Sequence, residues 1–242
     1  MQTPKRRVFL IHLAISAAIA AALAALMYLR WFPGELFAIA GGWQGLKLIL
    51  AVDLVLGPSL TLLFYRAGKK SAAFDLCLIA LLQSLALGYG VLQAYEQRVA
   101  ALAFAEGRFV AVPASALQLA ADELRAAGKP VPELDALDSH RPAQIAVEPF
   151  DTASYGEYLA DVMNGLPGLQ ERLDRYRPLV EGYAQIAPFA LDRAQLDADA
   201  RRRLDDCADC AAFRLDARYG SGVALVDAQR GRIRALLPAG RS

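Results

Sequence analysis

The sequence predicts a membrane protein with a three-helix transmembrane N-terminal part, residues 1–95. A small α+β extracytoplasmic domain, residues 96–242, follows and ends in an antiparallel β-meander. The chain is 56% hydrophobic with a mean hydropathy of +0.29, which is more apolar than a soluble protein usually is. The charge also changes along the chain: residues 1–94 carry 8 Lys/Arg against 3 Asp/Glu, and residues 95–242 carry 18 against 22. The acidic second part argues against a nucleic acid as partner.

Three stretches are long and apolar enough to cross a bilayer, whose core needs about 20 mostly apolar residues from a helix. They cover residues 8–29, 43–65 and 72–95. The first is longer than the roughly 7–15 apolar residues of a signal peptide. Arg30 and Trp31 follow it as an interfacial anchor. We therefore expect an uncleaved transmembrane helix there.

The second stretch carries a costly residue. Asp53 lies near its middle, and Gly57-Pro58 follows one turn later. A carboxylate at the centre of a bilayer costs roughly 2.5–3.5 kcal/mol on insertion scales, so it is normally paired or turned to the protein interior. Pro58 has no N–H to donate to the carbonyl of Leu54, which predicts a kink just past Asp53.

Depth along the helices indicates partners for Asp53. Asp53 is about ten residues into its stretch, or roughly 15 Å, and Gln83 is about eleven residues into the third stretch. Gln83 and Ser84 are therefore the expected hydrogen-bond partners, whereas His12 lies nearer the cytoplasmic end. A role in packing or in contact with a partner is favoured over a proton or ion relay, which would need a chain of ionisable groups across the membrane.

Small residues recur one turn apart on two of the stretches. They are Ser16, Ala20 and Ala24 on the first, and Ala80, Ser84 and Gly88 on the third. Small residues at this spacing let helix backbones approach closely in lipid. For the first row, the alternative is that it merely reflects an alanine-rich composition.

Basic residues set the expected orientation. Two clusters should lie on the same side: Lys5, Arg6 and Arg7 before the first stretch, and Arg66, Lys69 and Lys70 between the second and third. Loops rich in Lys and Arg stay in the cytoplasm. We therefore expect a cytoplasmic N-terminus and, after three crossings, a C-terminal domain on the outer side of the membrane, which in a Gram-negative bacterium is the periplasmic side of the inner membrane.

The second domain shows mixed local patterns. The third transmembrane helix is expected to continue to about residue 105. Further helices are expected over 114–127, 155–163, 169–176, 179–186 and from a cap at Asp192 to about 206, and strands over 108–112, 145–147, 213–215, 222–226 and 233–237. The last three strands are short apolar runs separated by turn residues, which is typical of an antiparallel meander.

Cys207 and Cys210 are the pair that suggests chemistry. Outside the inner membrane the compartment is oxidising, and a structural disulfide is the favoured interpretation. A thiol oxidoreductase would place its first cysteine at a helix N-terminus, whereas this pair follows a predicted helix. A zinc site would need further ligands, and His140 is the only histidine of this domain. Two free thiols are the remaining alternative. No catalytic residue, cofactor site or metal ligand is predicted.

A series of short motifs runs through the membrane part. They are Trp31-Phe32-Pro33, Gly41-Gly42-Trp43, Val52-Asp53-Leu54-Val55-Leu56-Gly57-Pro58, Leu60-Thr61-Leu62, Gly68-Lys69-Lys70-Ser71, Phe74-Asp75-Leu76, Gln83 and Tyr89-Gly90. In this order they resemble the type IV pilin accessory proteins, the TfpX/TfpZ-like family. The run from Val226 to Gly231 is similar to the end of those proteins, whereas Cys207 and Cys210 are not part of that pattern.

The resemblance implies a non-catalytic, chaperone-like protein that binds a major or minor type IV pilin and assists its stability, maturation or assembly. The pilin would wait in the same membrane by an apolar helix of its own, and other inner-membrane proteins of pilus assembly would be further partners. Candidate residues for packing or partner contact are Asp53, Gln83, Gly57, Pro58, Ala80, Ser84 and Gly88. The alternatives are a membrane-anchored periplasmic thiol-disulfide redox protein using Cys207 and Cys210, and a small transporter, which three helices disfavour.

Overall fold

The computed structural model describes residues 5–64 and 72–239, which form two compact units. The helical unit comprises Met1–Pro33 with Gly41–Glu96, and the second unit comprises Gly34–Ala40 with Gln97–Ser242. The basic connection expected at 66–71, with Arg66, Lys69 and Lys70, lies outside the described residues.

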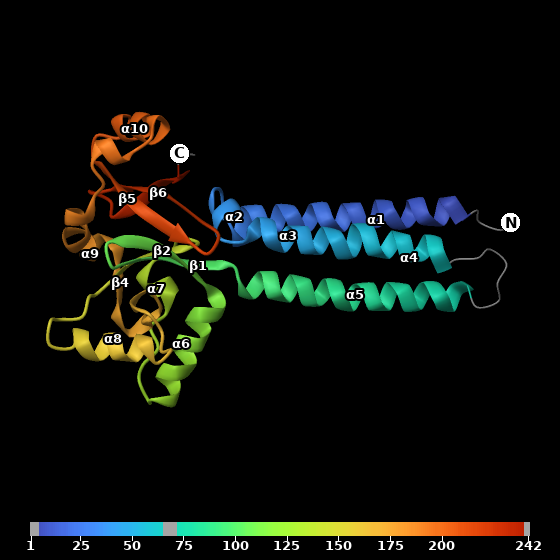
Figure 1. Ribbon diagram of the computed structural model, residues 1–242, viewed down its shortest axis with the longest axis horizontal. Coiled ribbons are helices and arrows are strands. Elements are labelled where there is room, and N and C mark those ends of the chain that lie inside the picture. Colours follow the sequence, from blue (N-terminus) through green and yellow to red (C-terminus); the bar gives the residue numbers. More distant parts are fainter. Residues whose placement is uncertain (1–4, 65–71, 240–242) are drawn as a thin grey trace. The chain divides into compact units, whose positions relative to one another are not determined.

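The helical unit contains three long helical segments that lie side by side (Figure 1). They are α1 (Lys5–Leu26), continued by a π-helical segment over Met27–Trp31; the α3–α4 segment, made of α3 (Gly42–Leu50), a π-helix over Ala51–Leu56 and α4 (Gly57–Phe64); and α5 (Ala72–Glu96). Within the described residues, three stretches are long and apolar enough to cross a membrane: Arg6–Trp31, Gly42–Leu63 and Cys77–Glu96.

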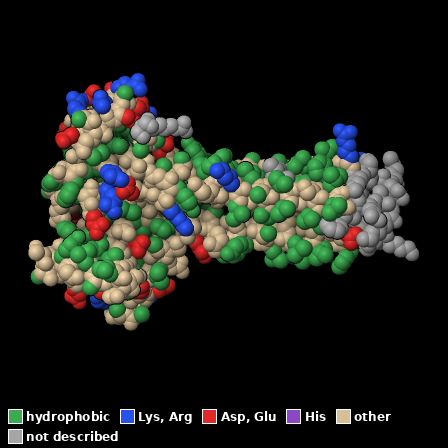
Figure 2. Space-filling model, in the orientation of Figure 1, with side chains coloured by type: hydrophobic (Ala, Val, Ile, Leu, Met, Phe, Trp, Pro, Cys, Tyr) green, Lys and Arg blue, Asp and Glu red, His purple; other side chains and the backbone are tan. Residues whose placement is uncertain are grey.

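The surface of these helices is apolar. Many large side chains point outward, and Leu29 and Leu85 are 66% and 63% exposed. Figure 2 shows hydrophobic side chains spread over the helices, whereas Lys, Arg, Asp and Glu gather on the second unit. Soluble monomers rarely expose apolar patches of this extent. The helical unit therefore fits a membrane protein.

The position before Gly57-Pro58 is π-helical rather than simply kinked. The N–H of Gly57 donates to the carbonyl of Val52, five residues back. Because Pro58 has no N–H, the carbonyl of Leu54 loses its usual donor, and a local π-helical adjustment is one way in which membrane helices accommodate proline. The adjustment also takes the usual helical donor away from the carbonyl of Asp53.

The second unit is built on a mixed seven-stranded sheet with the order β4-β3-β1-β2-β5-β6-β7. Its strands are β1 (Val99–Ala105), β2 (Arg108–Pro113), β3 (Ala143–Val147), β4 (Tyr176–Pro178), β5 (Cys210–Ala217), β6 (Gly220–Asp227) and β7 (Arg232–Pro238). The β1/β3 and β2/β5 pairs are parallel and the others antiparallel. The last three strands form the predicted meander.

Helices cover both faces of this sheet. They are α2 (Leu36–Ile39), α6 (Ala114–Ala126), α7 (Leu134–Leu137), α8 (Tyr155–Met163), α9 (Leu179–Ile186) and α10 (Ala198–Asp205). Leu117 of α6 shares a core with Ala103 and Ile145. The α9 helix packs against β3 at Ala146, which points to the opposite face because side chains alternate along a strand.

The expected continuation of the third helix to residue 105 is wrong. The α5 helix ends at Glu96, and Val99–Ala105 is β1, which pairs with both β2 and β3. Nearly every position of this alanine-rich run is buried. A short run that is apolar at every position has no periodicity that distinguishes a buried strand from a helix. Pairing with β2 and β3 makes this run a strand.

Two other predicted helices are also wrong. Residues 169–176 form two 3₁₀ turns and the start of β4, because Tyr176 is buried and its hydroxyl donates to the carbonyl of Gln170. The helix expected from Asp192 is divided. Asp192 precedes a 3₁₀ turn, and the carboxylate of Asp197 caps α10 by accepting from the N–H of Ala200 at 2.7 Å.

The short α2 helix packs with the second unit. It contacts β6, and the carbonyl of Ile39 accepts a hydrogen bond of 2.8 Å from the N–H of Tyr219. A Cβ placed on Gly220 would lie 3.1 Å from Cγ2 of Ile39, so the glycine leaves room for that side chain. The segment between the first two long helices therefore belongs structurally to the domain that follows the third.

A buried carboxylate organises the turn between β6 and β7. Asp227 is 5% exposed and accepts from the N–H groups of Arg230 and Gln229 at 3.0 and 3.1 Å. The guanidinium of Arg230 donates to its second oxygen at 3.1 Å. These donors, the N–H of Arg230 first, hold the pKa of Asp227 below its ordinary value. The Val226–Gly231 run noted in the sequence thus contains a turn that Asp227 holds from within, and the N–H of Ala228 ties it to the carbonyl of Asp209 at 2.9 Å.

Gly182 is predicted to be required where α9 crosses the sheet. A Cβ at this position would overlap the Cβ of Ala146 on a central strand. We expect Gly182→Ala to lower the free energy of unfolding by roughly 1–3 kcal/mol through overpacking, although alanine favours helices. The matched control is Gly156→Ala in α8, where a Cβ meets nothing within 4 Å. Chemical unfolding of both full-length variants in detergent, followed by circular dichroism, tests this; equal stability of the two contradicts it.

Asp227 is predicted to make stability depend on pH. Its folded-state pKa is lowered, so its contribution is fully present above the unfolded-state pKa of about 3.9 and is lost as the pH falls through the folded-state value. We expect Asp227→Asn to unfold more easily than the natural protein at pH 7, with the difference shrinking on acidification. Unfolding midpoints measured from pH 7 to about 3 check this, and a gap that widens towards acid pH would rule it out.

Candidate functional site

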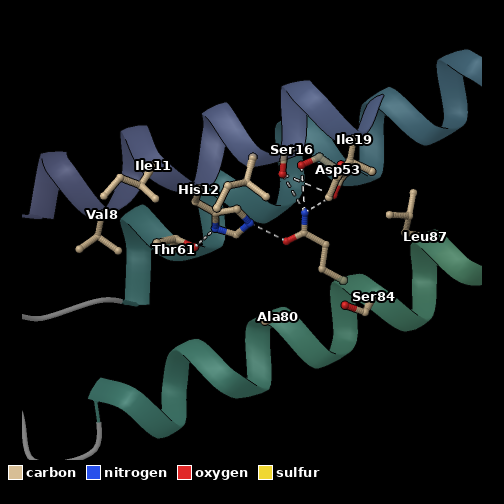
Figure 3. Close-up of a pocket in the computed structure, with 12 residues that line it drawn as sticks. Val8, Ile11, His12, Ser16, Ile19, Asp53, Thr61, Ala80, Ser84 and Leu87 are labelled. Carbon is tan, nitrogen blue, oxygen red and sulfur yellow. Dashed lines mark hydrogen bonds between the residues drawn. The ribbon is translucent and has the colours of Figure 1, made fainter. Parts of the chain in front are cut away.

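Polar side chains from all three long helical segments meet inside the otherwise apolar unit (Figure 3). They are His12 and Ser16 from α1, Asp53 from the π-helix, Thr61 from α4 and Gln83 from α5. Asp53, Ser16 and Thr61 are each at most 2% exposed. An unpaired polar group is costly in apolar surroundings. The five side chains avoid most of this cost by bonding to one another in one connected network.

Gln83 is the central donor of this network. Its Nε2 donates to the carboxylate Oδ1 of Asp53 and, at 3.0 Å, to the backbone carbonyl of Asp53. That carbonyl is the one which the π-helix deprives of its usual donor, since the N–H of Gly57 bonds to Val52. Ser16 Oγ also donates to Asp53 Oδ1, at 3.4 Å. The irregular backbone and the glutamine therefore complement each other.

Gly57 makes this approach possible. A Cβ on Gly57 would overlap the side-chain amide of Gln83. Glycine is used where another group must come close to the backbone. The π-helix that precedes Pro58 thus accounts for the freed carbonyl of Asp53, and Gly57 accounts for the space in which Gln83 reaches it.

His12 extends the network towards Thr61. Its Nε2 lies 2.9 Å from Gln83 Oε1, and its Nδ1 lies 2.7 Å from Thr61 Oγ1. Because the amide nitrogen of Gln83 faces Asp53, its oxygen must accept, so His12 Nε2 carries the donated hydrogen. The hydroxyl of Thr61, which lies against Nδ1, donates to the carbonyl of Gly57 at 3.2 Å.

One acceptor of the network is left over. Oδ2 of Asp53 is buried and has no hydrogen-bond partner among the residues that the structure describes. The other carboxylate oxygen receives bonds from Ser16 and Gln83. A buried acceptor without a donor is unfavourable, and the residue that carries it, Asp53, lines a groove.

The groove runs between α1 and α5, both of which pack against the α3–α4 segment. Its volume is about 360 Å³. Its walls are mainly apolar, and the polar network forms part of its lining (Figure 3). The lining residues are Val8, Ile11, His12, Ile15, Ser16, Ile19, Asp53, Thr61, Ala80, Gln83, Ser84 and Leu87.

The structure places the residues predicted from sequence in different roles. The expected hydrogen bond between Gln83 and Asp53 is present, whereas Ser84, the other expected partner, is exposed and makes no bond to Asp53. Ala80 and Ser84 line the groove and are exposed, and a Cβ on the exposed Gly88 would meet nothing within 4 Å. Within the described residues, no other helix packs on this row of small residues, and its side chains are exposed.

The first row of small residues is used inside the chain, since Ser16 and Ala20 are buried. His12 was missed as a partner of Gln83, because depth counting placed it nearer the cytoplasmic end. The signal was its position one turn before Ser16 on a helix with few other polar residues.

Cys207 and Cys210 form a disulfide with a Cα–Cα distance of 5.3 Å. The bridge closes the connection between the C-terminal end of α10 and β5. A reactive thiolate is favoured at a helix N-terminus rather than here. No group of three or more His, Cys, Asp or Glu that could hold a metal ion occurs among residues 5–64 and 72–239.

Comparisons with known proteins point in one direction. A segment of 96 residues, 39% of this chain, is 33% identical to fimbrial assembly proteins of serogroup I, of serogroups C1 and C2, and of serogroup E1 from Dichelobacter nodosus. The segment covers 73% of the C1 and C2 protein but only 37% of each of the other two. No protein-family model matches the chain, and no solved structure is significantly similar. With a third of positions identical over most of one relative, the chain belongs to the family of fimbrial assembly proteins.

Proposed function

We propose that this protein is a non-catalytic accessory factor of type IV pilus assembly, of the TfpX/TfpZ-like kind, which binds a pilin and assists its stability, maturation or assembly. The observation that carries the proposal is the 33% identity to fimbrial assembly proteins over 96 residues. The apolar groove that this network lines, with Oδ2 of Asp53 unpaired among the described residues, supports a binding role.

The proposed location is the bacterial inner membrane, with residues 1–95 crossing it and residues 96–242 folded in the periplasm. The three apolar helices support this arrangement. The hydrogen bond between Ile39 and Tyr219 also supports it. Those residues precede the second span and follow the third, and two crossings between them return the chain to the same side. The basic Arg6 and Arg7 favour a cytoplasmic N-terminus.

A pilin and other inner-membrane proteins of pilus assembly are the proposed partners. A pilin with an apolar helix in the same bilayer would meet the exposed apolar surface of α1 and α5. Its periplasmic part would face the domain built on the seven-stranded sheet. Both parts of the chain are therefore available for contact.

Loss of the protein is predicted to abolish or sharply reduce surface pili while pilin is still synthesised. The test is deletion of the gene in its own bacterium, restoration with the affinity-tagged full chain, and immunoblotting of sheared pili and of whole cells. The tagged chain should co-purify pilin from membranes solubilised in mild detergent. Normal piliation without the gene, together with no pilin in the purified fraction, would contradict the proposed function.

The disulfide gives a test of compartment. In an oxidising periplasm Cys207 and Cys210 should be bridged in cells, leaving Cys77 as the free thiol. Acid-trapped, denatured protein should therefore take up one polyethylene glycol maleimide, and three after reduction. Three labels without reductant would place the domain in a reducing compartment.

The redox alternative uses the same two cysteines. The double variant Cys207→Ser/Cys210→Ser should support normal piliation wherever its protein level matches that of the natural chain, because the bridge is proposed to be structural. Loss of piliation at an unchanged protein level would instead favour the redox alternative.

A further inference from the structure

We propose that the groove between α1 and α5 is the docking site for one apolar membrane helix of a pilus subunit, and that this helix donates a hydrogen bond to Oδ2 of Asp53. The proposal rests on the proposed function and adds to it a place and a chemistry of contact. It starts from the combination of an open groove and a buried acceptor at its lining.

The unused acceptor is the strongest feature. Asp53 is 2% exposed, and among the described residues only Oδ1 of its carboxylate is hydrogen-bonded. Buried polar groups are nearly always paired, and carboxylates inside membranes pair with protein groups. A partner that fills the groove lined by Asp53 would bring a donor to this oxygen.

The walls of the groove select an apolar helix. Ile11, Ile15 and Ile19 recur four residues apart on α1, so they lie along one face. Across the groove, Ala80 and Ser84 present small side chains one turn apart on α5. Small residues let a partner backbone approach closely, and long aliphatic side chains fill the space on either side.

The polar lining of the groove then determines which chemical group the docked helix must present. A lipid acyl chain would satisfy the isoleucines but has no hydrogen to donate to Asp53. A hydroxyl, amide or ammonium group on the docked helix, at the depth of Asp53, would satisfy both requirements. The inferred partner is therefore a largely apolar helix with one hydrogen-bond donor near its middle.

A photo-crosslinking residue tests the position of the contact. Placed at Ile15, which lines the groove and is 55% exposed, it should crosslink to pilin in membranes. The control is Leu10 on the same helix, which is 49% exposed but does not line the groove and should give no such product. Crosslinking from Ile15 to a second copy of this chain, or to no protein, would overturn the proposal, as would equal pilin crosslinking from both positions.

Substitutions test the chemistry. Asp53→Asn keeps Oδ1 for Ser16 and Gln83 but replaces the Oδ2 acceptor with a donor, so pilin co-purified per tagged chain should fall roughly tenfold or more. Ala80→Leu, which fills the groove, should have a similar effect, whereas Ala86→Leu, an exposed position on α5 outside the groove, should not. Natural pilin recovery with Asp53→Asn and Ala80→Leu would overturn the proposal.

Two further readouts separate the proposals. Gln83→Met breaks the network inside the chain, so it should lower the protein level itself, whereas Asp53→Asn should leave that level near the natural one. If the natural chain recovers no pilin at all, the proposed function fails and this inference with it. If pilin is recovered but crosslinks only from Leu10 or from the second unit, only the groove proposal fails.

Discussion

The carboxylate of Asp53 is the constraint on which the arrangement of the helices depends. It lies buried in an apolar unit, and groups from α1 and α5 converge on it. Pro58 and the π-helix free a backbone carbonyl next to it, and Gly57 leaves room for Gln83 to bond to both acceptors. A single costly residue thus brings polar groups of three helical segments together, and its Oδ2 has no donor among the described residues.

The core of this site could be predicted from sequence because depth in a membrane helix is a simple count of residues. That count brought Asp53 and Gln83 to the same level, and their hydrogen bond is present. It could not find His12, because long side chains reach across more than a turn, and His12 contacts Gln83 and Thr61. Nor could it locate the groove, which depends on which faces of α1 and α5 remain unpaired.

The second unit was harder to predict where the backbone depends on distant partners. The meander of β5, β6 and β7 was predictable because local turns join strands that are neighbours in sequence. The β1 strand was mistaken for helix because its partners, β2 and β3, decide its state and β3 lies about forty residues away. Residues 169–176 were mistaken for helix for the same reason. The burial of Tyr176 at the start of β4 outweighs the local helix propensity of this segment.

The contact of α2 with β6 has a consequence for how the chain is made. The segment Gly34–Ala40 is synthesised long before Tyr219 and Gly220, yet it packs with them. If the helices cross a bilayer as proposed, a chain inserted with one span missing leaves these two segments in different compartments, where the contact cannot form. Stability of the folded domain then acts as a check on insertion, so mis-inserted chains are the less stable ones exposed to proteolysis.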